Sequence, residues 1–187
     1  MCGILGTSSN LESEKNLFPS EELFRKSLSL IDHRGPDGKG IFYDNKSSVS
    51  LGHTRLSILD LSKRSNQPMI SKDGDTVLIF NGEIYNYLEI KKELKCLGHN
   101  FKTSSDTEVL LTSIEQWGLD VSLNKFIGMF AFAVYDKKLN ELTLVRDRFG
   151  EKPLYYASLN DSLIFGSELK ALKAHPDWLG NIDKDSL

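Results

Sequence analysis

The sequence predicts an α+β fold in which two stacked, mainly antiparallel sheets lie between two outer layers of helices. Strand-like segments follow one another in hairpin-like pairs, and amphipathic helical segments lie between them. Segment 129–135 (MFAFAVY) has no polar alternation, which indicates a strand covered on both faces. Segment 141–147 (ELTLVRD) alternates apolar and polar residues, which is typical of a strand with one buried face. Together these observations favour the layer order helix, sheet, sheet, helix.

The N-terminal half is predicted to hold one helix among several strands. Pro19 and Ser20 open the helix, since apolar residues recur after them at helical spacing: Leu23, Phe24, Leu28 and Ile31. Segment 33–40 (HRGPDGKG) is rich in glycine and is expected to be loop, as is the polar stretch 62–75. Strands are expected at 2–8, 41–44, 47–53, 54–59 and 75–81.

The C-terminal half is predicted to hold two longer helices and four consecutive strands. Asn86 and Glu89 are expected to cap a helix over 86–97 whose apolar face carries Tyr87, Ile90, Leu94 and Leu97. After a short strand at 99–103, Ser105 and Glu108 form a capping box that opens a helix with Leu110, Ile114 and Trp117 inward. Strands at 129–137, 140–147, 153–158 and 162–167 precede a last short helix over about 168–175.

Composition excludes several classes of protein. The 187 residues carry a net charge of −3, so no basic excess favours nucleic acid or an anionic membrane. The longest apolar run, 126–135, is far short of the ~20 residues of a membrane span, and no signal peptide is evident. We therefore expect a cytoplasmic protein with one domain over 2–179, followed by the start of a linker over 180–187.

The cysteines and histidines indicate neither a disulfide framework nor a metal site. Cys2 and Cys96 are too few for such a framework, and Cys96 is expected to pack within its helix. The four histidines have no metal-ligand spacing with either cysteine or with one another: His33, His53, His99 and His175.

Cys2 is the first candidate for chemistry. If Met1 is removed, Cys2 carries both a thiol and a free α-amine with a pKa of ~7.7–8.0, which gives one residue a nucleophile and a base. The alternative is a small buried hydrophobic residue at the start of a strand. Position alone does not decide between them.

Seven motifs resemble the glutaminase domain of glutamine-hydrolysing asparagine synthetases, which are class II amidotransferases with an N-terminal cysteine nucleophile. They follow Met-Cys-Gly-Ile in the order of that family: HRGPDG (33–38), GHTRLSILD (52–60), FNGEIYN (80–86), SSDTEV (104–109), GMFAFAVYD (128–136), RDRFGEKPLYY (146–156) and SELKAL (167–172). The resemblance implies the αββα sandwich of the N-terminal-nucleophile hydrolases, which agrees with the predicted layers. HRGPDG is expected to flank the pocket, and Arg146, Asp147, Lys152 and Pro153 to form a charged turn.

The resemblance also implies roles for individual residues. Cys2 is the nucleophile, Asn81 and the N–H of Gly82 form the oxyanion hole, and Arg55 binds the glutamine α-carboxylate. Glu83 and Asp106 face the α-ammonium, and the binding segment includes Leu56, Ile58 and Leu59. Three of these residues have structural alternatives: a surface ion pair for Arg55, a turn for Asn81-Gly82 and a helix-dipole contact for Asp106.

The function implied is hydrolysis of L-glutamine to glutamate and ammonia, with ammonia passed to ATP-activated aspartate. ATP and magnesium are expected only in a C-terminal synthetase domain, acting in cis or in trans, and no cofactor in this chain. Two alternatives stay open: an amidotransferase with another acceptor, such as a sugar or a different carboxylate, and a non-catalytic relative used as a binding module. A homodimer is one option for assembly.

Overall fold

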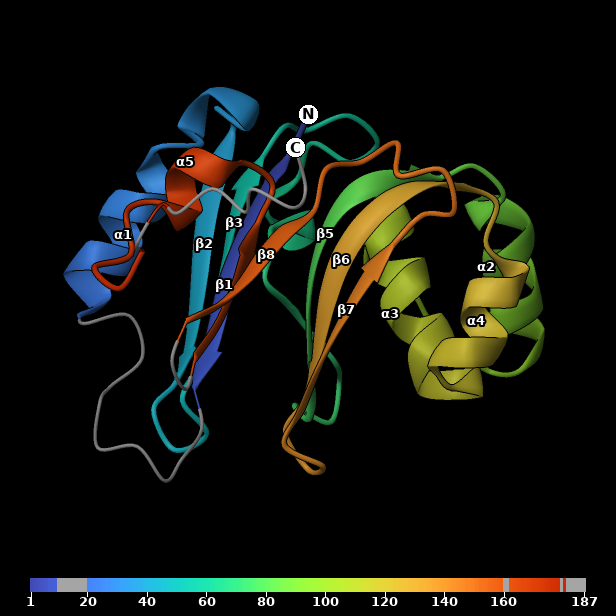
Figure 1. Ribbon diagram of the computed structural model, residues 1–187. Coiled ribbons are helices and arrows are strands. Elements are labelled where there is room, and N and C mark those ends of the chain that lie inside the picture. Colours follow the sequence, from blue (N-terminus) through green and yellow to red (C-terminus); the bar gives the residue numbers. More distant parts are fainter. Residues whose placement is uncertain (10–19, 160–161, 179, 181–187) are drawn as a thin grey trace.

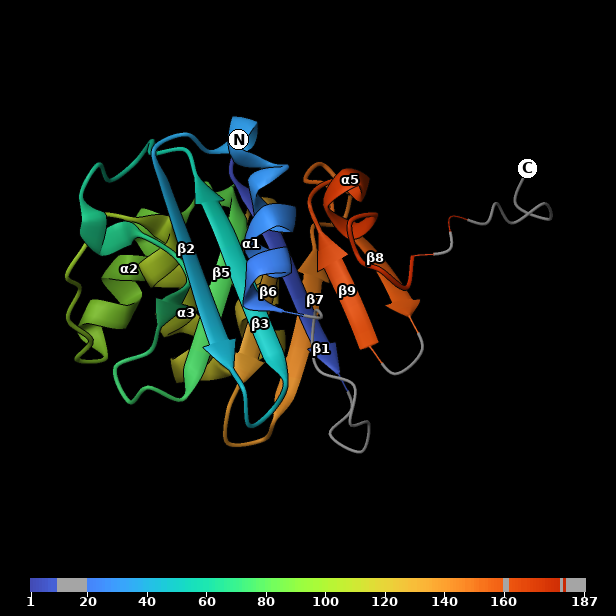
Figure 2. The same cartoon turned by 90° about the vertical axis from the view of Figure 1, so that its left-hand side faces the viewer.

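The computed structural model describes residues 1–9, 20–159, 162–178 and 180, and it has the four layers expected from the sequence (Figure 1). One outer layer holds α1 (Glu21–Ser29) and α5 (Leu169–Leu172), and the other holds α2 (Tyr87–Cys96), α3 (Asp106–Trp117) and α4 (Leu119–Lys125). A view turned by 90° shows α1 and α5 lying over the face of the first sheet (Figure 2). The predicted α+β class and αββα order are confirmed.

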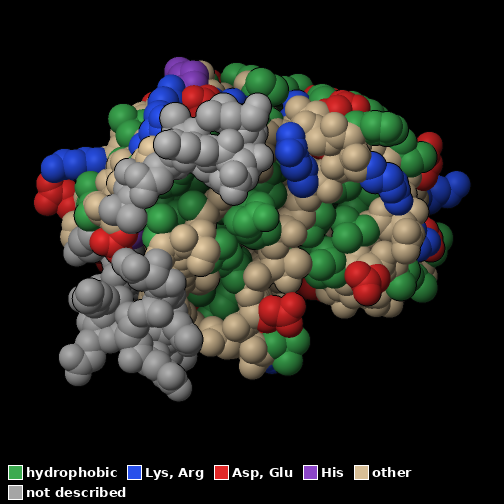
Figure 3. All heavy atoms as spheres, viewed as in Figure 1, with side chains coloured by type: hydrophobic (Ala, Val, Ile, Leu, Met, Phe, Trp, Pro, Cys, Tyr) green, Lys and Arg blue, Asp and Glu red, His purple; other side chains and the backbone are tan. Residues whose placement is uncertain are grey.

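Both sheets are antiparallel throughout. The first has the order β2 (Gly38–Asp44), β3 (Val49–Arg55), β1 (Gly3–Ser9), β9 (Ser162–Gly166), β8 (Tyr155–Leu159). The second has the order β4 (Met69–Ile70), β5 (Thr76–Ile84), β6 (Gly128–Asp136), β7 (Glu141–Arg146). In Figure 3, hydrophobic side chains reach the surface between the edge strands β8 and β7.

Strand β6 is buried on both faces, as its sequence predicts. Phe130, Phe132 and Val134 pack with residues of α2 and α3, whereas Ala131 and Tyr135 pack with the first sheet. Large apolar side chains thus fill the helix side, whereas the sheet side combines two small residues, Ala131 and Ala133, with the large ring of Tyr135. A third cluster joins α1 and α5 to the outer face of the first sheet.

Strand β1 occupies the centre of the first sheet, between β3 and β9. Its first residue, Gly3, pairs with Thr54, one position before the end of β3. The register therefore places Cys2 at the same end of the sheet as Arg55. Strand β5 of the second sheet contacts both β1 and β3, so it brings Asn81 towards that end.

Several predicted elements are wrong. Strand β3 runs unbroken to Arg55, and residues 56–59 leave the sheet because the Arg55 guanidinium binds the loop that follows. No strand forms over 99–103, where the main-chain N–H groups of Lys102 and Thr103 donate to the Glu108 carboxylate. The expected loop 33–40 contains a 3₁₀ turn, Asp32–Arg34, and the first residues of β2. The expected loop 62–75 contains a 3₁₀ turn, Lys63–Ser65, and β4.

The helix ends also differ in detail. Ser20 and Ser105 cap α1 and α3 through their hydroxyls, but Glu108 reaches back beyond Ser105 to Lys102 and Thr103. Asn86 holds the N-cap position of α2, yet its side chain bonds the 125–127 segment instead. Two residues expected in the buried face of α2 are exposed, because the helix ends there: Cys96 and Leu97. Pro19 and most of the 180–187 tail lie outside the described residues.

Candidate active site

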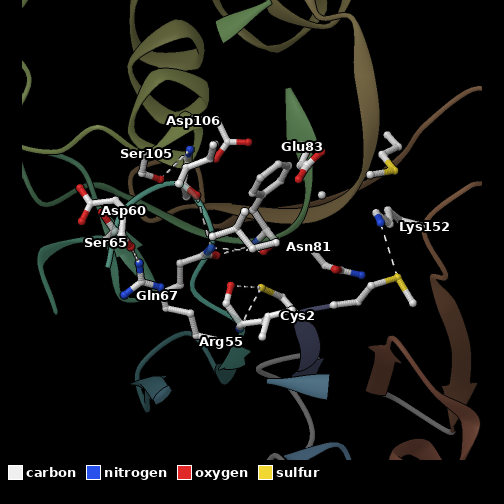
Figure 4. Close-up of a pocket in the computed structure, with 18 residues that line it drawn as sticks. Cys2, Arg55, Asp60, Ser65, Gln67, Asn81, Glu83, Ser105, Asp106 and Lys152 are labelled. Atoms are coloured by element: carbon white, nitrogen blue, oxygen red, sulfur yellow. Dashed lines mark hydrogen bonds between the residues drawn. The ribbon is translucent and has the colours of Figure 1, made fainter. Parts of the chain in front are cut away.

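A cavity of about 210 Å³ opens where the ends of the two sheets meet. Its walls come from the start of β1, the end of β3 and the loop after it, the middle of β5, and the first turn of α3 (Figure 4). All eight residues that the sequence analysis assigned to glutamine chemistry besides Cys2 lie along this wall: Arg55, Leu56, Ile58, Leu59, Asn81, Gly82, Glu83 and Asp106. Cys2 lies there as well.

The Cys2 side chain makes two hydrogen bonds with the main chain of Leu56. The thiol donates to the Leu56 carbonyl at 3.6 Å, and the Leu56 N–H donates to the sulfur at 3.4 Å. Burial raises the pKa of the thiol above its ordinary value, although the Leu56 hydrogen bond opposes this. The thiol is therefore protonated near neutral pH and needs a base before it can act as a nucleophile.

The main chain of Cys2 is fixed by an arginine that the sequence analysis placed only in a flanking loop. Arg34 donates from Nε to the Cys2 carbonyl at 2.9 Å and pairs with Glu168 at 3.1 Å. Burial acts to raise the pKa of Glu168, but hydrogen bonds from Arg34, Lys170 and His33 outweigh it and lower the value to about 2. The two motifs HRGPDG and SELKAL thus meet behind the nucleophile.

Strand β5 presents donors to the cavity. The Asn81 side chain is buried, and its Nδ2 atom has no hydrogen-bond partner among the described residues. On the edge of β5 that faces away from β6, the Phe80 N–H donates to Gln67 and the Ile84 N–H donates to Asp106. Because alternate residues of a strand point their N–H groups to the same side, the Gly82 N–H lies on this edge between those two bonds.

Gly82 is also required by packing. A Cβ atom there would lie 2.4 Å from the Met129 carbonyl oxygen and 2.7 Å from the Phe130 Cα of β6. Both are main-chain atoms of the neighbouring strand, so a larger residue would push β5 away from β6. The Asn-Gly pair therefore lies inside a strand, and the alternative of a turn is wrong.

Arg55 is almost fully buried, and its guanidinium organises the loop after β3. It donates to the carbonyls of Asp60 and Ser62 and to the side chain of Asn66. Asp60 in turn accepts from Ser104 just before α3, and hydrogen bonds from Ser62 and Ser104 lower the pKa of its carboxyl. Leu56, Ile58 and Leu59 are carried on this loop, with Ile58 and Leu59 exposed at the mouth of the cavity.

Asp106 lies at the start of a helix and also lines the cavity. It is the first residue of α3, and one carboxylate oxygen accepts from the Ile84 N–H at 3.0 Å. It is also only 5 % exposed and lines the cavity with Glu83. Burial raises the pKa of Asp106 to about 6, so its carboxylate is ionised only above that pH.

Several residues that line the cavity were not assigned to the site from the sequence, among them Gln67, Met129 and Lys152. The Lys152 ammonium lies 3.5 Å from the Met1 sulfur (Figure 4). The expected charged turn is confirmed around Asp147, which accepts main-chain bonds from both sides of the 147–152 loop. Within the described residues, no cluster of His, Cys, Asp or Glu is suited to a metal ion. None of the described helices has the length and apolar character of a membrane span.

Comparison with known proteins agrees with this geometry. A family model described as a glutamine amidotransferase domain matches residues 1–187. Asparagine synthetase [glutamine-hydrolyzing] 3 of Bacillus subtilis is 40% identical over 189 residues, which cover 100% of this chain and 30% of that protein. Amidase chry2 of Gibberella zeae is 38% identical over 161 residues, covering 84% of this chain and 24% of that protein.

Among solved structures, glutamine phosphoribosylpyrophosphate amidotransferase from B. subtilis has the same fold. It aligns with a TM-score of 0.77 at 24% identity, over 92% of this chain and 43% of that one. The chain thus spans about 30% of the length of the B. subtilis asparagine synthetase.

Proposed function

The chain belongs to the glutamine amidotransferase domain family, and from that premise we propose that it hydrolyses L-glutamine to glutamate and ammonia through a thioester on Cys2. The observation that carries the proposal is the cavity that joins the Cys2 sulfur, the unpartnered amide nitrogen of Asn81 and the buried carboxylate of Asp106. A buried donor with no partner is costly unless a ligand supplies an acceptor, and a developing oxyanion is one.

The first half-reaction begins with removal of Met1, which gives Cys2 a free α-amine. The Cys2 sulfur adds to the carbonyl carbon of the glutamine side-chain amide, and the thiol proton passes to this amine. The oxyanion accepts hydrogen bonds from the Asn81 side chain and the Gly82 N–H. The amine returns the proton to the amide nitrogen, the C–N bond breaks, and ammonia leaves a γ-glutamyl thioester.

In the second half-reaction, water adds to the thioester and gives up a proton to the α-amine of Cys2. The C–S bond breaks, the sulfur recovers the proton, and glutamate is released. Asp106 and Glu83 hold the substrate ammonium throughout. The positive charge of Arg55 faces the substrate α-carboxylate. The guanidinium keeps its hydrogen bonds to the loop after β3 while it does so.

The acceptor of the ammonia is proposed from the relatives. The names of several relatives specify glutamine-dependent asparagine synthesis, which favours ATP-dependent amidation of aspartate, with ATP and magnesium bound outside these 187 residues. A different acceptor remains the second candidate, because two relatives are named as amidases. The observation specific to this chain is the cavity that contains Cys2, Asn81 and Asp106, and the proposal of glutamine hydrolysis does not depend on the acceptor.

The test is a glutaminase assay on the purified chain, with intact-mass analysis of the N-terminus. We expect active protein to lack Met1, and Cys2→Ala to abolish hydrolysis while glutamine still binds. Cys96→Ala is the matched control, because that thiol is exposed at the end of α2 and should have no effect on hydrolysis. Full activity with Met1 retained, or in Cys2→Ala, would exclude the mechanism. Glutamine binding by wild type without any hydrolysis would instead favour a binding module without chemistry.

A further inference from the structure

Gln67 continues the second sheet with its side chain instead of its main chain. Strand β4 pairs Met69 with Leu78, so the same register carried back along the chain places residue 67 opposite Phe80. There the Gln67 side-chain oxygen accepts from the Phe80 N–H at 2.6 Å, and its Nε2 donates to the Phe80 carbonyl at 3.2 Å. The side-chain amide thus makes the pair of bonds that a neighbouring strand would make.

The same amide joins this strand to the first turn of α3. Nε2 of Gln67 also donates to the Thr107 hydroxyl at 3.4 Å, and Thr107 follows Asp106. His53 of β3 donates from Nε2 to the Phe80 carbonyl at 3.1 Å, which fixes the tautomer of its neutral ring. Gln67 is 6 % exposed, so water does not compete strongly for these bonds.

The hydrogen bonds between Gln67 and Phe80 lie next to the proposed oxyanion donors. Phe80 precedes Asn81, and the Gly82 N–H lies on the same edge of β5, between the Gln67 bond and the Asp106 bond. The two ends of a bound glutamine would therefore depend on Gln67 together: the reacting carbonyl at Asn81 and Gly82, and the ammonium at Asp106.

We propose that Gln67 is a positioning residue for glutamine hydrolysis, which holds the Asn81–Gly82 oxyanion donors in a fixed relation to Asp106. This inference rests on the proposed function. Gln67 touches no reacting atom, and it acts through the Phe80 main chain and Thr107. Loosening it should reduce the turnover number more than glutamine binding, because a displaced oxyanion donor weakens the transition state most.

Gln67→Glu tests this with a change of one atom. A protonated carboxyl can accept from the Phe80 N–H and donate to the Phe80 carbonyl, as the amide does, whereas a carboxylate cannot donate. The charged side chains that line the cavity with Gln67 are Arg55 of β3, Asp60 of the loop after it, Glu83 of β5, Asp106 of α3 and Lys152. His53 stays neutral because burial lowers its pKa to about 3. Wild type contains these same groups, so their titration largely cancels in the ratio of variant to wild type.

We expect kcat of Gln67→Glu at pH 8 to fall at least ~10-fold, with KM within about threefold of wild type. As the pH is lowered towards about 5.5, burial favours the protonated carboxyl, and the ratio of variant to wild-type kcat should rise. The matched control is Gln116→Glu, the same change at an exposed position of α3, which should leave the ratio at one at every pH.

A second variant covers the case in which Gln67→Glu does not fold. Thr107→Val removes one acceptor of Gln67 and keeps the shape of the side chain. It should lower kcat by about two- to fivefold and the unfolding temperature only moderately, so that the variant is still folded at the assay temperature. A wild-type kcat in Gln67→Glu at pH 8, a ratio that does not change with pH, or an unaffected Thr107→Val would overturn this inference alone. Absence of glutamine hydrolysis by wild type would overturn the proposed function and this inference with it.

Discussion

At the scale of single residues, Asp106 shows how the site opposes the stability of the fold. Its carboxyl has a pKa of about 6 because it is buried, whereas the model-compound value is 3.8. The folded state therefore binds the proton more tightly than the unfolded state does. The contribution of Asp106 to stability is greatest below about pH 4 and is lost as the pH rises through about 6. At neutral pH the protein holds an ionised carboxylate at a free-energy cost.

Asp106→Asn should separate stability from function. Asparagine can still accept the Ile84 N–H but carries no charge, so we expect the variant to gain on the order of 2–3 kcal/mol in free energy of unfolding at pH 8. The gain should vanish near pH 4, and urea unfolding at the two pH values measures it. KM for glutamine should rise at least ~10-fold, the scale of a hydrogen bond to a charged group. Equal stability of both proteins at pH 8 would contradict the assigned cost.

Asn81→Ala should act on turnover instead. Loss of one oxyanion donor typically costs ~10²–10³-fold in kcat. KM should change little, because the proposed mechanism places Asn81 at the oxyanion and away from both charged groups of the substrate. Asn124→Ala, at an exposed position of α4, is the control for loss of an asparagine side chain. A rise in KM with normal kcat would show that Asn81 binds the ground state and is not an oxyanion donor.

Sequence reasoning identified the site residues that lie in recognisable motifs, and it missed those whose role depends on a contact made only in the folded protein. Cys2, Asn81 and Asp106 stand inside recognisable motifs, so their gathering around one cavity could be predicted. Gln67 and Arg34 act on main-chain atoms of residues far along the chain, and no motif records such a contact. Arg34 pairs with Glu168, which is 134 residues away in sequence. Only the folded register brings these partners together.

At the scale of elements, long periodic segments were predictable and short ones were not. Helices α2 and α3 and strands β5 and β6 follow their apolar spacing closely. The two residues of β4 and the seven of α4 are too short for a periodic signal. The predicted strand at 54–59 failed for another reason, since its composition favours a strand but the Arg55 side chain binds the following loop. Tertiary contacts overrode local propensity there.

Hydrogen bonds from His33 and Arg34 to Glu168 connect the 3₁₀ turn Asp32–Arg34 to the start of α5. Glu168, just before α5, accepts from His33 and Arg34, and its pKa is lowered to about 2. A lowered pKa stabilises the folded state above the ordinary value of 4.5, and this contribution is lost as the pH falls towards 2. Glu168→Gln should therefore cost about 1–2 kcal/mol at pH 7 and close to nothing near pH 2.

Urea unfolding at pH 7 and in acid measures this difference, and Glu89→Gln on α2 is the control at an exposed glutamate. We also expect kcat of Glu168→Gln to fall, because Arg34 holds the Cys2 carbonyl. A variant that loses stability but keeps full kcat would indicate that Arg34 holds Cys2 without Glu168.

At the scale of the whole molecule, the four layers place every residue of the proposed glutaminase mechanism within these 187 residues. The resemblance of the seven motifs implies that ATP binds to a separate synthetase domain and not to these residues. We therefore expect the purified chain to release glutamate and ammonia from glutamine, and to form no asparagine from aspartate, ammonia and ATP. Parallel assays of both reactions measure this, and ATP-dependent asparagine formation by this chain would contradict the division of roles.

The central place of β1 has a consequence for how the protein is made. Strand β1, which follows Cys2, has its neighbours at 49–55 and at 162–166, so one of its two edges stays open until almost all of these residues have left the ribosome. A nascent chain therefore carries β1 with one unpaired edge through most of translation, and we expect Met1 to be accessible to an aminopeptidase during that time. Once β9 has joined the sheet, the N-terminus is held in the cavity.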